Sequence, residues 1–153
     1  MEVEGTGVIP TEGLYDTVYD WDMRIQMSDG VKMTFKPGGD STKFIGPDGW
    51  VRIWWGGIDA EPKSLLQSKI GPDDVHLAVS GDQHQDFVDC MKSRRQPVSP
   101  IVDAVRSDVI SLLCNIAVRT GRKIQWNSKE EVIVGDEEAS RMTSRPMRAP
   151  WTL

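Results

Sequence analysis

No apolar run in this 153-residue chain approaches the roughly 18 residues that cross a bilayer as a helix. The first residues, MEVEGTG, lack the basic and apolar regions of a signal peptide. Basic side chains are not in excess, because 18 Lys and Arg stand against 23 Asp and Glu, for a net charge of −5. This balance gives no electrostatic reason to bind nucleic acid or an anionic membrane. We therefore expect a cytoplasmic protein with neither as a partner.

The chain is also poor in the side chains of metal and nucleophile chemistry. It has two cysteines, Cys90 and Cys114, with no CxxC spacing and no Cys/His cluster, which excludes a disulfide framework and indicates no zinc site. Its two histidines, His76 and His84, have no neighbouring residues that would mark a catalytic triad. We therefore predict no catalytic residue and no metal ligand.

Two glycine-containing stretches imitate nucleotide-binding loops without their chemistry. Gly5-Thr-Gly7-Val-Ile-Pro10 places a proline where the third glycine of a dinucleotide fingerprint would be, and no helical pattern follows. We interpret it as the end of a strand that runs into a loop. Residues 38–43, GGDSTK, lack the GK[ST] order of a phosphate loop and indicate a hairpin loop. The residues thus predict no cofactor site.

Strict alternation of apolar and polar residues from Tyr19 to Met27 predicts a strand. Asp29-Gly30 then supplies a tight turn, and alternation resumes from Val31 to Phe35, so we predict a β-hairpin. Two further strands are expected at residues 42–45 and 50–55, joined by the turn Gly46-Pro47-Asp48-Gly49. Together these segments predict one antiparallel meander of four or more strands.

Beyond residue 62 the period becomes helical. Asp82 can cap a helix that runs past His84, and Ser99-Pro100 can begin a second helix that Gly121 ends. That second helix carries an apolar stripe of Val102, Val105, Val109, Leu112, Leu113 and Ile116. Short extended pieces are expected at residues 123–126 and 132–134, and Asp136 can cap a last helix through Met142. The final residues, 145–151, predict an extended tail.

This order of elements predicts one domain, residues 1–153, with an α+β fold: a predominantly antiparallel sheet that carries its helices on one face. We expect a core in which one face of the sheet packs under the second helix. Its predicted members are Trp21, Met23, Ile25, Met33 and Phe35 from the strands, and Val105, Val109, Leu112 and Ile116 from the helix.

Four segments carry a family resemblance: FVDCMKSRRQP (residues 87–97), RSD (106–108), NIAVRTGRKIQW (115–126) and GDEEASRMTSRPMRAPW (135–151). In order and spacing they resemble the C-terminal part of the Gfo/Idh/MocA oxidoreductases, which are glucose-fructose oxidoreductase-like, NAD(P)-dependent sugar and inositol dehydrogenases. FIGPDGW (residues 44–50) and Ala60-Glu-Pro are weaker matches to the same family. The resemblance covers most of the chain, from about Val3 onward.

The resemblance implies an N-terminal Rossmann domain with a glycine-rich turn, an E-K-P lysine and a D-x-x-x-H helix, and this sequence contains none of them. Val105 and Leu112 stand where family members often have histidine. We therefore expect an isolated C-terminal domain that lacks a Rossmann domain and is catalytically inert alone. NAD(P) would be bound only if a Rossmann domain is supplied elsewhere. Two alternatives stay open: half of a split oxidoreductase completed by a separate Rossmann chain, and a stand-alone sugar-binding or scaffolding module.

The sheet itself predicts self-association. Trp54 alternates with Val51, Ile53 and Trp55 and so is expected on the side of the sheet away from the core. The interface that we predict consists of Arg24, Thr34, Arg52 and Trp54, and Trp and Arg are enriched in interface cores. The resemblance points the same way, because family members associate through this sheet. We expect a homodimer or a larger even-numbered oligomer.

Overall fold

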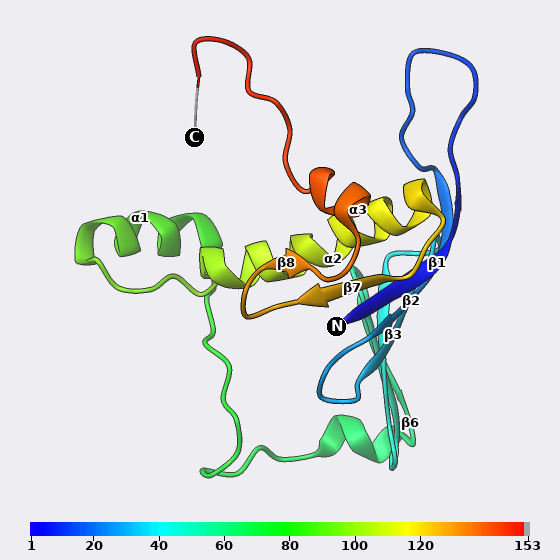
Figure 1. Ribbon diagram of the computed structural model, residues 1–153. Coiled ribbons are helices and arrows are strands. Elements are labelled where there is room, and N and C mark those ends of the chain that lie inside the picture. The colour runs from blue at the N-terminus through cyan, green and yellow to red at the C-terminus, as the bar shows by residue number, and fades with distance from the viewer. Residues whose placement is uncertain (152–153) are drawn as a thin grey trace. The chain divides into compact units, whose positions relative to one another are not determined.

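The computed structural model describes residues 1–151 and divides the chain into two compact units. The first unit joins residues 1–37 to the C-terminal part from Ile101 onward, and the second comprises residues 38–100. Figure 1 shows the ribbon with its element labels. Both sheets are antiparallel and three α-helices accompany them, so the predicted α+β class is confirmed. None of the helices in these residues has the length and apolar character needed to cross a membrane.

The first unit is built on a five-stranded sheet of order β3-β2-β1-β7-β8. Its strands are β1 (Glu2–Val8), β2 (Asp20–Gln26), β3 (Lys32–Phe35), β7 (Ile124–Asn127) and β8 (Val132–Ile133). The alternation in β2 has the predicted effect, because Met23 and Ile25 are buried while Asp22 and Arg24 are exposed. The two faces of this sheet therefore differ in chemistry.

The predicted β2–β3 hairpin is confirmed, with a small difference in its turn. The Met27 amide donates to the Val31 carbonyl at 2.8 Å and the Gly30 amide donates to the Met27 carbonyl at 3.2 Å. Among the turn residues 28–30, only Gly30 has a positive φ, at 94°. The loop thus has three residues, with glycine where a left-handed residue is required, rather than a two-residue turn.

Strand β1 is the largest departure from the sequence-based expectation, which placed only a strand end here. It lies at the centre of the sheet, between β2 and β7. A side chain at Gly5 would collide with the Asp22 carbonyl oxygen at 2.2 Å, and one at Gly7 would meet Val18 and Val118 at 2.8 and 2.9 Å. These glycines therefore allow β2 and the helix above to approach the strand closely.

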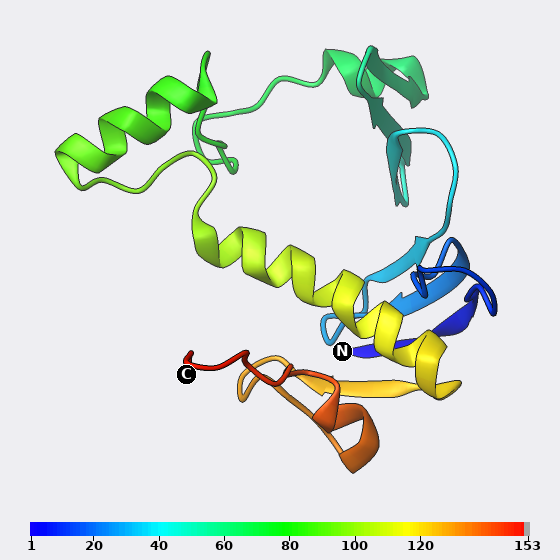
Figure 2. The ribbon, with the colours of Figure 1, turned by 90° about the horizontal axis from the view of Figure 1, so that it is seen from above.

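Helix α2 (Ile101–Thr120) packs on β1 and supplies most of the helical part of the core. It begins after Ser99-Pro100 and is followed by Gly121 with φ 63°, as predicted. The short α3 (Glu137–Arg141) is capped by Asp136, whose side chain accepts from the Ala139 amide at 3.0 Å. Figure 2 shows α2 lying along one side of the strands.

The predicted core is right for the strand residues other than Met33 and partly wrong for the helix. Met23 and Ile25 are buried, and Trp21 and Phe35 pack against the core. On α2 the buried residues are Leu113, Cys114, Ile116 and Ala117. Leu112 and Val105 were wrongly predicted, being 54% and 49% exposed, and Met33 lies at the sheet edge with 36% exposure. The reason is that α2 is buried only in its C-terminal half. The buried face there begins at Leu113 and leaves Leu112 exposed.

The second unit contains a separate three-stranded sheet of order β4-β5-β6. Its elements are β4 (Ser41–Gly46), β5 (Gly49–Trp54), β6 (Gly57–Glu61), the 3-10 helix η1 (Lys63–Gln67) and α1 (Gln83–Ser93). The predicted strands at 42–45 and 50–55 are confirmed, whereas β6 was not foreseen. The single continuous meander is wrong, because β3 and β4 belong to different sheets.

Candidate functional site

Within the first unit, the described helices α2 and α3 leave one face of the five-stranded sheet uncovered, and we call it the open face. Because side chains alternate along a strand, it carries the even-numbered residues of β1 to β3, opposite the buried Val3, Met23 and Ile25. Its positions are Glu2, Glu4, Thr6 and Val8 on β1, Asp20, Asp22, Arg24 and Gln26 on β2, and Lys32 and Thr34 on β3. Charged side chains of both signs thus occupy the exposed side of this unit.

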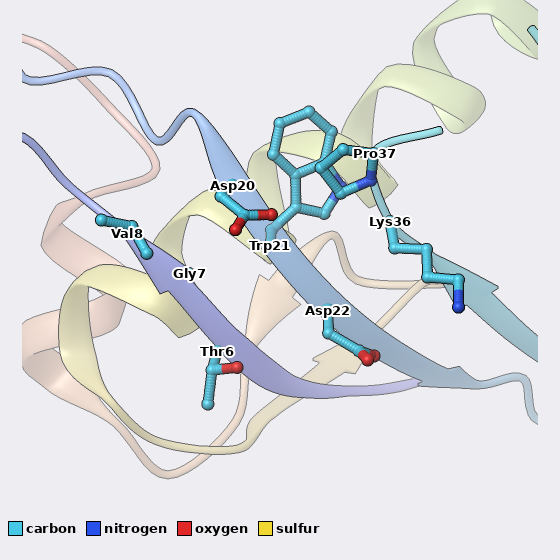
Figure 3. Close-up of a pocket in the computed structure, with 8 residues that line it drawn as sticks. All are labelled: Thr6, Gly7, Val8, Asp20, Trp21, Asp22, Lys36 and Pro37. Carbon is cyan, nitrogen blue, oxygen red and sulfur yellow. The ribbon is translucent and has the colours of Figure 1, made fainter. Parts of the chain in front are cut away.

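One end of the open face holds a cleft of about 310 Å³ next to the β1–β2 loop. Figure 3 shows Asp20 and Asp22 on the same side of β2, with Thr6 on the neighbouring strand. Lys36 and Pro37 form another wall, and Trp21 lies beside Pro37. Neither aspartate makes an ion pair with any residue that the structure describes. This end of the face is therefore acidic, with Lys36 as its one cation.

Trp21 forms the back of this cleft and joins it to the core. Its ring centroid lies 5.3 Å from that of Phe35 in a tilted arrangement. The indole Nε1 is buried and has no hydrogen-bond partner among residues 1–151. An unpaired buried N–H is costly, so Trp21 is held here by its packing and not by polar contacts.

The other end of the open face holds a groove of about 320 Å³ near the β2–β3 hairpin. Arg24, Lys32 and Lys123 bring three cations to it. The Lys123 ammonium bridges two carboxylates, at 3.1 Å from Glu2 and 3.4 Å from Glu4. These contacts, first the hydrogen bond to Glu2, raise the pKa of Lys123. Glu2 and Glu4 also line this groove, so Arg24 and Lys32, which make no ion pair with the described residues, leave it with one net positive charge.

The four predicted interface residues fall into two pairs on two sheets. Arg24 and Thr34 face each other across β2 and β3 on the open face. Arg52 and Trp54 lie on β5, where the Arg52 guanidinium stands 5.0 Å from the centre of the Trp54 ring. This second pair shares its face with Lys43, which lies 4.2 Å from the centre of the Trp50 ring. The sequence placed all four residues on one surface, and the structure places two on each sheet.

The histidines and cysteines do not form a catalytic cluster with one another or with other side chains that the structure describes. His76 Nε2 lies 2.8 Å from the Gly71 carbonyl oxygen, and His84 is exposed at the start of α1. Burial is the main cause that raises the pKa of both thiols, and that of Cys114 reaches about 11. Among residues 1–151, no three His, Cys, Asp or Glu side chains gather as a metal site would require.

Sequence reasoning missed the contacts that connect distant parts of the chain. Lys123 and Glu2 are 121 residues apart, and Arg119 and Asp16 are 103 apart. No local spacing could have linked them. The unpaired charges on β2 carried a readable signal, because the predicted alternation already placed Asp20, Asp22 and Arg24 on one face.

A comparison with family models matches residues 16–153 to the C-terminal alpha/beta domain of an oxidoreductase family. No curated protein and no solved structure matches the chain.

Proposed function

The chain belongs to the Gfo/Idh/MocA oxidoreductase family, and we propose that residues 1–153 serve as the C-terminal domain of a sugar or inositol dehydrogenase of that family. The domain is catalytically inert by itself and self-associates through its sheet. The observation that carries the family assignment is the match over residues 16–153. Catalysis then requires the cofactor and the catalytic lysine of a Rossmann domain.

The pattern of charge on the open face supports self-association. Along β2, Asp20 and Asp22 lie toward the loop end, and Arg24 lies toward the hairpin end beside Lys32 of β3. A two-fold axis that runs perpendicular to the strands reverses their direction in the second copy. It therefore sets the acidic end of one face over the basic end of the other. Sheets stack about 10 Å apart, a gap that aspartate and arginine side chains can bridge together.

The experiment is charge exchange followed by sedimentation velocity. Arg24→Asp places a third carboxylate on β2, and Asp22→Arg places a second cation there, so each variant alone repels its own copy. We expect each to be monomeric where the unmodified chain is dimeric. Mixed in equal amounts, the two variants restore both opposite-charge contacts and should form a heterodimer. Lys129→Asp, in the β7–β8 turn, is the matched control and should leave the dimer intact.

A monomeric unmodified chain at tens of micromolar, or a mixture that stays monomeric, would contradict the proposal. Trp54→Glu addresses the other predicted pair, Arg52 and Trp54, which would build a larger even-numbered assembly from the dimer. In that case Trp54→Glu stops assembly at the dimer. If it instead abolishes the dimer, the interface lies on β5 and not on the open face.

One observation favours the alternative that a separate Rossmann chain completes the enzyme. Helix α2 exposes an apolar stripe, with Val102, Val105 and Leu112 each about half exposed. Apolar surface of this kind is typical of a contact with another domain. The test is NADH-dependent turnover after addition of a Rossmann domain from a family member, with Val105→Asp as the variant that should abolish it.

A further inference from the structure

The three-stranded sheet of the second unit is closed at one edge and bare at the other. At the β6 edge, the Ala60 amide donates to the Asp59 carboxylate at 2.8 Å, and Ala60 is only 1% exposed. The 3-10 helix η1 packs on the same strand (Figure 1). At the opposite edge, β5 is the one described strand that pairs with β4, and every residue of β4 is exposed. A bare edge of this kind is a template for another strand.

The register of the β4–β5 hairpin shows which backbone groups of β4 face outward. The two-residue turn at 47–48 makes the residues that flank it a hydrogen-bonded pair, and bonded pairs then alternate along the antiparallel ladder. Phe44 therefore bonds to β5, whereas the amides and carbonyls of Lys43 and Ile45 point away from it. These two amides have no hydrogen-bond partner among residues 1–151. The edge of β4 thus offers the backbone groups of two residues for pairing.

The side chains of β4 are suited to an added strand. One face of the sheet carries uncharged residues at all its paired positions: Thr42 and Phe44 of β4, Val51 and Ile53 of β5, and Ile58 and Ala60 of β6. Phe44 stands at the bare edge of this face and is 60% exposed. On the other face the Lys43 ammonium lies 4.2 Å from the centre of the Trp50 ring, over the neighbouring strand. The charge that could block the edge is therefore drawn back from it.

One register of β4 against a second copy of itself satisfies these groups. Two-fold pairing is antiparallel, and outward residues of one strand must bond to outward residues of the other. A pairing centred on Lys43 sets two like charges opposite each other. A pairing centred on Ile45 sets Lys43 against Pro47, which has no N–H to donate. A pairing centred on Phe44 instead bonds Lys43 of each copy to Ile45 of the other.

We propose that β4 strands of two copies pair about a two-fold axis at Phe44 and join their three-stranded sheets into one. The two Phe44 rings then lie side by side on the uncharged face, in a pair without mutual backbone bonds, where side chains are closest. This contact lies in the second unit and does not rest on the proposed function, which uses the open face of the first. It buries one short strand, so we expect it to be weaker than the open-face dimer and to form above tens of micromolar.

The test is disulfide trapping with Phe44→Cys in the full chain under mild oxidation. The Cα atoms of the central pair stand about 4.5 Å apart, within the range that a disulfide spans, so we expect a dimer linked through position 44. Peptide mass mapping identifies the link, and the native Cys90 and Cys114 are buried. Thr42→Cys, on the same strand and face, is the matched control. Its two copies would stand roughly 13 Å apart and should not link.

A second pair of variants tests the backbone bonds themselves. Ile45→Pro, made in the Phe44→Cys chain, removes an outward N–H and leaves the β4–β5 ladder intact, since proline is tolerated on edge strands. We expect this change to abolish the link, whereas Ile45→Ala keeps the N–H and should retain it. In the unmodified chain, the Lys43 and Ile45 amides should exchange their hydrogens more slowly as the protein concentration rises.

The outcomes separate this inference from the proposed function. Equal linking of Phe44→Cys and Thr42→Cys would indicate random collision and overturn the pairing, as would the absence of a link or a link that survives Ile45→Pro. Arg24→Asp, made in the Phe44→Cys chain, lies on the open face and should leave the link in place. A chain that forms the open-face dimer but no link through position 44 overturns the β4 pairing alone.

Discussion

Leu112 and Leu113 are consecutive on α2, yet only one of them belongs to the core. Leu113 is 2% exposed and Leu112 is 54% exposed. Consecutive helix positions are about 100° apart, so a face centred on Leu113 and Ala117 turns Leu112 toward solvent. The two leucines therefore offer the same substitution with and without burial.

We expect Leu113→Ala to lower the free energy of unfolding by about 2–5 kcal/mol, because it removes buried methyl groups and leaves a cavity. Leu112→Ala should change it far less, since half of that side chain already contacts water. Urea denaturation of both variants measures the difference. Equal shifts of the midpoint would show that the buried face of α2 is assigned wrongly. The same reasoning applies to Ile25, which is 2% exposed on β2.

Gly5 and Gly7 show at the residue scale why a motif can mislead. Their spacing imitates the start of a dinucleotide fingerprint, but both lie within β1. The space beside Gly7 is filled by Val18 and Val118, and that beside Gly5 by Met23. Close packing of protein on protein thus accounts for both glycines.

Helix α3 depends on one carboxylate that serves two partners. Asp136 accepts from the Ala139 amide as the N-cap and from Arg122 Nε at 2.9 Å. These contacts, first the one to Arg122 and then the one to Ala139, lower the pKa of Asp136. Because the folded-state pKa is depressed, the stabilisation is present above the unfolded pKa of about 3.9 and is lost as pH falls through the folded value.

The prediction is that acid sensitivity of the fold is reduced in Asp136→Asn. The amide keeps its capping oxygen but has no proton to gain, so urea midpoints of this variant should fall less steeply below about pH 4 than those of the unmodified chain. Asp40→Asn, in an exposed loop, is the control and should follow the unmodified chain. Parallel curves for all three proteins would refute the coupling.

At the scale of elements, the sequence predicted the helices, because capping and terminating residues mark their ends. Asp82 and Asp136 cap α1 and α3, Ser99-Pro100 precedes α2, and Gly121 follows it. It missed β1 and β6, because both contain glycine and acidic residues, which strands disfavour. Their place in a sheet depends on neighbouring strands, as β1 lies between β2 and β7. Such pairing has no local signal.

The candidate site was likewise predictable from the sequence only in part. Alternation alone placed Arg24 and Thr34 on a shared face, and β2–β3 pairing bears out that placement. It could not show that β5 belongs to another sheet, which separates Arg52 and Trp54 from them. Nor could it find the clamp of Arg119 on Asp16, a contact across 103 residues. Long-range contacts of this kind follow from the fold and not from the order of residues.

For the whole molecule, a net charge of −5 on each copy opposes association, since two acidic chains repel each other at a distance. Self-association therefore depends on local charge pattern and not on overall charge. On β2 and β3, the separation of Asp20 and Asp22 from Arg24 and Lys32 provides that pattern, and Lys123 partly offsets Glu2 and Glu4 of β1. Salt should weaken both the repulsion and the attraction, so its net effect on the dimer measures which of them dominates.

The distribution of acidic groups over the whole molecule also predicts that the chain does not bind NAD(P). A dinucleotide needs backbone amides at a helix N-terminus for its pyrophosphate, where the helix dipole favours negative charge. Here the first turn or cap of every described α-helix already carries a carboxylate: Asp82 and Asp86 at α1, Asp103 at α2, and Asp136, Glu137 and Glu138 at α3. Asp82 and Asp136 already accept from such amides, and all of these carboxylates repel phosphate. We therefore expect no heat of binding when NADH or NADPH is titrated into the chain in a calorimeter. A dehydrogenase with an intact glycine-rich turn, titrated in parallel, is the positive control. Micromolar binding to residues 1–153 would show that a cofactor site exists outside any Rossmann domain, and would remove the basis for assigning catalysis to a second domain.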